Sequence, residues 1–473
     1  MSLSNSAFRS FLRAVLAALD EPGADDAIRM DGSGVLPSRY PVTDLACASI
    51  GAAGLMLARW VDPVCPPLVR LDRPLASWWF GYTLKPQGWQ IPAVRDAVTG
   101  DYAAADGWIR LHANAVHHRQ RALRVLGLPD DAVRDQVAAR VCAWSAVDLE
   151  DALVEQAACA AALRTPAQWR GHPQGLAVAG EPLLHRQDGA SCAGFPRSAV
   201  QDGATVWTQG DASSAARPLA GLRVLDLTRV LAGPVCTRFL AAYGAQVLRL
   251  DPAGWDEPGM APEVTVGKRC AELNLRDPVG VDRFRRLLAQ ADVLVHGYRP
   301  DALDRLGLGA DVRQQLRPGL VDVSLDAWGW TGPWRNRRGF DSLVQMSTGT
   351  AWPGRPDVKP DPLPVQALDQ AAGYWMAACV LKGLIDRRER SRGSVWRTSL
   401  ARVAALLASD PMAAAHEKTE PSLGAVPSDA YETAIEATAW GPAYRLRAPC
   451  RVGDVRWRWD RPAGALRSSP PDW

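Results

Sequence analysis

One aspartate and a set of cations are the residues of this 473-residue sequence whose types and positions could do chemistry. Asp369 lies in the segment 364–373 and is expected to precede an apolar helix that ends near Leu384. A carboxylate in that place could cap the helix, or it could attack an electrophilic carbonyl carbon. Spacing alone favours the cap, so the residue pattern by itself leaves the reaction unassigned.

Several cations lie at or near the ends of the expected strands, which is where open parallel sheets bind ligands. They are Arg229, Arg249, Lys268, Arg269, Arg299, Arg305 and Arg338. Such cations could hold phosphate groups, or they could form a solvated, charged rim. The loop 229–234 has a single glycine and does not match GxGxxG, and no GxxxxGK[ST] occurs. These absences disfavour a dinucleotide reductase and a P-loop enzyme.

Composition narrows the class of protein. The 54 basic and 51 acidic residues leave a formal charge of +3, which disfavours nucleic acid as a partner. Nine cysteines are scattered singly, so we expect reduced thiols in a cytoplasmic protein and no metal site. The longest apolar stretch, 45–58, is too short to span a bilayer, so no membrane association is expected.

The elements that position these residues differ between the two halves of the chain. In the second half, strands expected at 222–227, 245–250, 292–295 and 321–325 alternate with helices, which predicts a parallel sheet of Rossmann type. The first half is expected to be rich in helices. Its expected elements are helices at 42–59, 116–126, 131–144 and 149–162 and a strand at 108–112.

Taken together and in order, segments of the second half resemble the family III CoA-transferases, also called the CaiB/BaiF family. They are 219–234, 243–249, 267–275, 291–300, 303–308, 329–333, 339–345 and 369–373. The resemblance implies an α/β fold, with a Rossmann-like parallel-sheet large domain and a helix-rich α+β small domain. It implies an enzyme that moves CoA from an acyl-CoA thioester to a carboxylic acid. No cofactor is bound permanently, because coenzyme A and acyl-CoA are substrates.

Residue roles carry over from the same resemblance. The nucleophile falls on Asp369, which would form a covalent aspartyl intermediate, and Asp341 is a second candidate catalytic residue, as an acid or as a helix cap. The resemblance implies CoA contacts at Arg229, Val230, Ala232, Tyr298, Arg305, Leu306 and Arg338. Arg249 and Lys268 are also expected to bind CoA, as cations near the strand ends.

The order of segments implies a permuted and partly duplicated member of the family. We divide the chain into an N-terminal helix and linker (1–35), a partial copy of the helix and strand after the nucleophile (36–100) and a small domain (101–201). A linker (202–217), a CoA-binding and catalytic domain (218–408) and a C-terminal return segment (409–473) follow. Family members form interlocked homodimers; this chain could keep that arrangement or satisfy it internally.

Two departures from the family pattern leave alternatives open. Leu231 stands where the family often has glutamine, and Phe340 stands where the racemase branch has histidine. Phe340 disfavours racemisation, which needs two opposed acid/base groups. The alternatives are an acyl-CoA isomerase or racemase of the same fold that uses other residues, and a non-catalytic CoA-binding protein.

Overall fold

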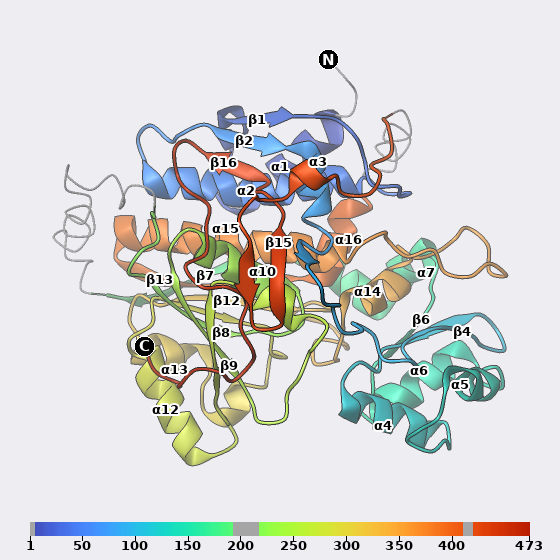
Figure 1. Ribbon diagram of the computed structural model, residues 1–473. Coiled ribbons are helices and arrows are strands. Elements are labelled where there is room, and N and C mark those ends of the chain that lie inside the picture. Colours follow the sequence, from blue (N-terminus) through green and yellow to red (C-terminus); the bar gives the residue numbers. More distant parts are fainter. Residues whose placement is uncertain (1–4, 193–216, 410–419) are drawn as a thin grey trace.

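A seven-stranded sheet forms the centre of the computed structural model, which describes residues 5–192, 217–409 and 420–473 (Figure 1). All neighbouring strands are parallel except the last pair, in which β7 runs antiparallel to β13. In sheet order the strands are β10 (Lys268–Glu272), β9 (Gln246–Asp251), β8 (Arg223–Leu227), β11 (Val293–His296), β12 (Val321–Asp326), β13 (Arg392–Ser399) and β7 (His185–Ser191). The expected mixed α/β fold with a large parallel sheet is confirmed.

Helices cover both faces of this sheet, as a parallel sheet requires. Alternate residues of β8 divide between the faces: Val224 packs in the core with α10 (Ala232–Ala242) and α15 (Ala367–Arg390). Leu225 packs in a second core with Phe284 of α12 (Pro278–Leu288). Figure 1 shows α10 and α15 on one side of the sheet and α12 with α13 (Ala310–Leu316) on the other. Strands buried on both faces explain the continuous apolar runs of the sequence.

The N-terminal segment adds another helix and a small sheet beyond α15. Helix α2 (Val42–Val61) lies against α15 and leads into β2 (Val69–Asp72), which pairs with β1 (Ile28–Asp31) and β16 (Cys450–Val452). Gly51 and Gly54 let α2 pack closely on the small sheet. A Cβ at Gly51 would lie 2.7 Å from the Ile28 side chain of β1, and a Cβ at Gly54 would lie 2.7 Å from the Cys450 side chain of β16. Helix α2 is long and apolar enough to cross a membrane, but 94% of its most apolar window is buried inside the protein. It is therefore a core helix here.

A separate module follows, with its own core (Figure 1, lower right). Its antiparallel strands are β4 (Gly100–Ala103), β5 (Trp108–Leu111) and β6 (Ala160–Ala162), and its helices are α4 (Val116–Val125), α5 (Arg134–Val141) and α6 (Ala146–Glu155). The helix expected at 149–162 is wrong in its second half. Ala157 adopts a positive φ of 55°, which ends the helix, and the following residues pair with β5 instead.

The C-terminal segment pairs with elements from both halves of the chain. Strand β15 (Gly441–Arg445) pairs with β14 (Glu436–Thr438) and with β3 (Leu84–Pro86). Farther on, Ser469 forms a parallel bridge with Ala271 in β10. Except for its last residue, the linker expected at 202–217 lies outside the described residues.

Candidate active site

A cavity of about 970 Å³ lies at the carboxyl ends of the parallel strands, where an open α/β sheet binds its ligands. Loops after β8, β9, β10, β11 and β12 contribute to its wall. The site residues expected from sequence that line this cavity are Arg229, Val230, Ala232, Tyr298, Arg305, Leu306, Arg338 and Asp369. The sheet thus brings together residues that are far apart in the sequence.

A cation and two aromatic rings form one corner of this cavity. Arg229 donates a hydrogen bond from Nη2 to the Tyr298 hydroxyl at 2.9 Å. Its guanidinium lies 5.0 Å from the ring centroid of Trp255 and 5.4 Å from that of Tyr298. Such a corner suits a ligand that carries both phosphate groups and an aromatic base.

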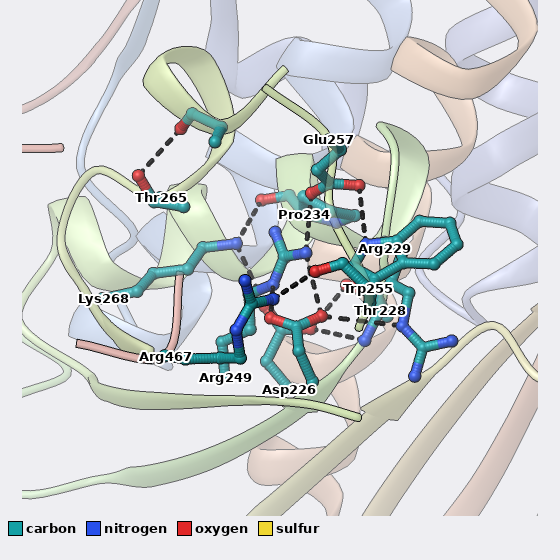
Figure 2. Close-up of polar contacts among 12 residues, drawn as sticks. Asp226, Thr228, Arg229, Pro234, Arg249, Trp255, Glu257, Thr265, Lys268 and Arg467 are labelled. Carbon is teal, nitrogen blue, oxygen red and sulfur yellow. Dashed lines mark hydrogen bonds and ion pairs between the residues drawn. The ribbon is translucent and has the colours of Figure 1, made fainter. Parts of the chain in front are cut away.

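The loop that carries Arg229 has a strained backbone. Val230 adopts a φ of 66°, which is rare for a β-branched residue and is kept only when neighbouring groups fix it. The Glu257 carboxylate accepts the Val230 N–H at 2.8 Å and is itself bound by Arg249 at 2.6 Å. Figure 2 shows Glu257 between Arg249 and the loop. Glu257 therefore holds the loop in the conformation that lets Arg229 and Val230 line the cavity.

The expectation that Arg249 and Lys268 contact CoA requires correction. Neither residue lines the cavity, and both side chains are fully buried. Arg249 forms ion pairs with Asp251 at 2.9 Å and Glu257 at 2.6 Å. Lys268 lies 3.0 Å from Asp226 and donates to the Pro234 carbonyl at 3.1 Å. Arg249 lies in β9 and Lys268 lies in β10, and both of these side chains point into the protein interior.

Asp369 lies in the first turn of α15 and faces open space on two sides. It lines the large cavity and also a second cavity of about 560 Å³. Its side chain is 8% exposed. Helix α10 approaches α15 closely one turn later, because Gly373 has no side chain; a Cβ there would lie 2.4 Å from the Ala232 carbonyl oxygen. This close approach places the helical turn that carries Asp369 beside the loop after β8.

Asp341 begins α14 (Asp341–Thr348) and caps the neighbouring helix α15 rather than its own. Its Oδ2 accepts the N–H groups of Leu368 at 2.8 Å and Asp369 at 2.9 Å, and Gln345 donates to its Oδ1. These contacts fix the position of the turn that presents Asp369.

Burial and the neighbouring Asp341 carboxylate make Asp369 costly to ionise. Burial raises the pKa of Asp369 well above its ordinary value near 3.8, and the charge of Asp341 raises it further. Burial raises the pKa of Asp341 to about 6, although the two N–H groups and Gln345 oppose the rise. An aspartate with a raised pKa is a stronger nucleophile once it has lost its proton.

The small module contributes site residues that the sequence analysis missed. His117 and His118 line the large cavity, and His112 stacks on Phe340 with ring centroids 3.7 Å apart. Trp255 was also missed, although its place after the second strand could have pointed to it. The histidines carried no sequence signal, because only the tertiary fold brings them to the sheet. Among the described residues no group of three or more His, Cys, Asp and Glu side chains could hold a metal ion.

Comparisons with known proteins agree on one family. The model of CoA-transferase family III matches residues 219–440. The probable fatty acyl-CoA transferase Rv3272 of Mycobacterium tuberculosis (strain ATCC 25618 / H37Rv) is 30% identical over 285 residues, which cover 52% of this chain and 72% of that protein. The succinyl-CoA:glutarate CoA-transferase of Mus musculus is 32% identical over 215 residues, or 42% of this chain; the match spans 49% of that relative's length.

Among solved structures, a CAIB/BAIF family protein from Brucella suis has 25% sequence identity and a TM-score of 0.38. The match covers 48% of this chain and 65% of that chain. From the family model and the identity to the Mycobacterium tuberculosis protein, the chain belongs to CoA-transferase family III.

Proposed function

We propose that this chain is an active CoA-transferase, which moves CoA from an acyl-CoA thioester to a carboxylic acid through a covalent intermediate on Asp369. The observation that supports it most is the position of Asp369. In the described part of the chain it is the one carboxylate that lines both cavities, so it can meet reactants from two sides.

The chemistry requires a carboxylate at this point. An oxygen of Asp369 attacks the thioester carbonyl carbon, the C–S bond breaks, and CoA leaves as a thiolate. The thiolate then attacks the aspartyl carbonyl of the mixed anhydride, which releases the donor acid and leaves CoA as a thioester on Asp369. The acceptor carboxylate reverses both steps and regenerates Asp369. An anhydride keeps the energy of the thioester, whereas a serine ester would lose it.

The large cavity is the proposed CoA site. Arg229, Arg305 and Arg338 supply positive charge for its phosphates, and Tyr298 supplies a ring for the adenine. Val230, Ala232 and Leu306 shape the remaining wall. Arg249 and Lys268 support this site from beneath and are not proposed to contact CoA.

Three expectations stay part of this proposal. The chain acts in the cytoplasm, it is either a homodimer or a self-contained monomer, and 36–100 is a partial copy of the segment after the nucleophile. The packing of α2 on α15, with a strand after each helix, supports the partial copy. Light scattering on the purified chain tests the dimer, which requires twice the mass of one chain.

Trapping with hydroxylamine tests the function. The protein is incubated with hydroxylamine and one of acetyl-CoA, succinyl-CoA or octanoyl-CoA, and its peptides are analysed by mass spectrometry. We expect an aspartyl hydroxamate at Asp369, because hydroxylamine attacks the activated aspartyl carbonyl. An unmodified Asp369 in a protein that turns over acyl-CoA would favour the isomerase; binding of CoA without any turnover would favour the non-catalytic protein.

The Asp341→Asn variant should shift the pH dependence of the reaction. Asparagine keeps an oxygen that can accept the two N–H groups of α15 but removes the negative charge that raises the pKa of Asp369. The pKa of Asp369 therefore falls, and the acid limb of the kcat profile moves to lower pH. Profiles from pH 5 to pH 9 measure the shift. The exposed Asp282→Asn variant is the control, and a limb that moves to higher pH would contradict the prediction.

A further inference from the structure

The second cavity, of about 560 Å³, is built by residues from both the N-terminal part and the second half of the chain. It meets the CoA cavity at Val230, Leu231, Trp255, Phe340 and Asp369, which line both. Its other walls come from residues 80–82, 93–99 and 110–115 and from the loops at 256–263 and 364–370. A reactant in this cavity would therefore reach Asp369 without passing through the CoA cavity.

A buried cation lies in this wall. Arg110 in β5 is only 5% exposed, yet it lines the cavity. Its Nε lies 3.2 Å from Asp101 Oδ1, and within the described residues no hydrogen bond reaches its two terminal nitrogens. Burial lowers the pKa of Arg110, and the charges of Asp101 and, to a smaller extent, Asp341 oppose this. A guanidinium that is buried with free donors suits an anionic ligand.

A second cation lies on the same side. Arg95 is exposed at the cavity and forms no described ion pair, and its charge helps to lower the pKa of Arg110. Burial is the largest cause that lowers the pKa of His112, and the charges of Arg110 and Arg95 lower it further, to about 3. His112 is therefore neutral at pH 7. The two arginines are thus the cationic groups on this wall.

The carboxylates around the cavity are mostly engaged elsewhere. Glu257 pairs with Arg249 at 2.6 Å, Asp96 pairs with Arg119 at 3.4 Å, and Asp341 caps α15. Glu263 is bound by the buried Arg238 and Arg445. Asp256 is exposed at the rim, where it accepts the Glu257 N–H. Asp101 pairs with Arg110 at its Nε, so the cationic donors that remain for an anion are the terminal nitrogens of Arg110 and the guanidinium of Arg95.

Part of the remaining wall is apolar. Phe80, Val94, Met260 and Val365 line the cavity together with the shared aromatic residues Trp255 and Phe340. A pocket with an apolar wall and a few convergent polar groups orients one end of a ligand and accepts the rest of it by size.

We propose that the second cavity is the acid site: Arg110 and Arg95 bind the carboxylate of the acid substrate, and the apolar wall holds its hydrocarbon part. This rests on the proposed function and adds the place and class of the acid, an organic carboxylate with an apolar body. The bound carboxylate attacks the carbonyl carbon of the Asp369–CoA thioester, the C–S bond breaks, and the thiolate leaves into the CoA cavity. The thiolate then attacks the acid's carbonyl, and the C–O bond to Asp369 breaks.

Binding measurements without turnover test this site. Hexanoate, benzoate and phenylacetate are titrated into the full chain at pH 7.5 by calorimetry, with hexanamide as the uncharged counterpart of hexanoate. We expect at least one acid to bind, hexanamide to bind more than about tenfold more weakly than hexanoate, and CoA to add without displacing the acid. Binding by none of the acids, equal binding of the amide, or displacement by CoA would overturn the proposal.

Two variants locate the site. Arg95→Gln, which changes an exposed side chain, should weaken binding of the acid about fivefold, and Arg110→Gln more than about tenfold. Arg124→Gln, on the exposed side of the same module, should leave it unchanged. Unaltered acid binding in the folded Arg95→Gln protein overturns the proposal.

Hydroxylamine trapping separates this inference from the proposed function. With acetyl-CoA or octanoyl-CoA, the Arg95→Gln variant should still form the hydroxamate at Asp369, because neither of these donors carries a free carboxylate. Absence of the hydroxamate in the unaltered protein would overturn the proposed transferase function. Normal hydroxamate formation together with unchanged acid binding in Arg95→Gln would overturn only the proposed acid site.

Discussion

Replacing Asp369 with asparagine is expected to lower kcat for CoA transfer by at least about a thousand-fold, since an amide can neither attack the thioester nor form the anhydride. Chromatographic detection of the acyl-CoA product measures the loss. The variant Asp282→Asn, which removes an exposed carboxylate from α12, should keep the full rate.

The Asp369→Asn variant should fold normally. No described hydrogen bond involves the Asp369 carboxylate, so its replacement leaves no described partner unpaired. The raised pKa of Asp369 means that its ionisation destabilises the folded state as pH rises above about 3.8, the ordinary pKa of aspartate. Asparagine has no such ionisation. The unfolding free energy of the variant relative to the parent should therefore increase from pH 5 to pH 8 in urea titrations.

One outcome would overturn the assignment of the nucleophile. If the variant keeps its rate, and mass spectrometry shows that the asparagine has not deamidated, Asp369 is not the nucleophile. The isomerase alternative would then gain support, with other residues acting on the acyl group.

The second half of the chain was largely predictable from its sequence. Strands expected at 222–227, 245–250, 292–295 and 321–325 match β8, β9, β11 and β12 to within one residue at each end. Buried parallel strands are short apolar runs between helices, and this local pattern is enough to locate them. The helix after Asp369 was also expected, although it begins two residues before Asp369 and ends at Arg390.

The parts that depend on tertiary structure were not predictable. Strand β10 begins with Lys268 and is too polar to be recognised by its composition, so Lys268 was assigned to the ligand site. No local pattern shows that Arg110 of the small module lines a cavity together with Asp369, or that Asp341 caps α15. Charged residues at strand ends can be found from sequence, but the direction in which each side chain points is set by the sheet.

Removal of the Lys268 ammonium is expected to lower the unfolding free energy strongly. Its ammonium and the Asp226 carboxylate are both fully buried, 3.0 Å apart, and Asp226 also accepts hydrogen bonds from Thr228 and Thr237. Lys268→Met removes one charge and leaves the other without its counterion in the interior. Such a loss costs about 3–5 kcal/mol of unfolding free energy, which urea titration at pH 7.5 can measure.

The double variant Lys268→Met with Asp226→Asn distinguishes a role of Lys268 in stabilising the fold from a role in binding CoA. Asparagine removes the stranded charge but keeps an acceptor for Thr228 or Thr237, so much of the lost stability should return. Calorimetry with CoA on the folded double variant should give a Kd within about twofold of the parent, since Lys268 lies outside the cavity wall. Unchanged stability in Lys268→Met together with weak CoA binding would instead place the ammonium on the ligand, because a side chain that binds CoA directly need not support the fold.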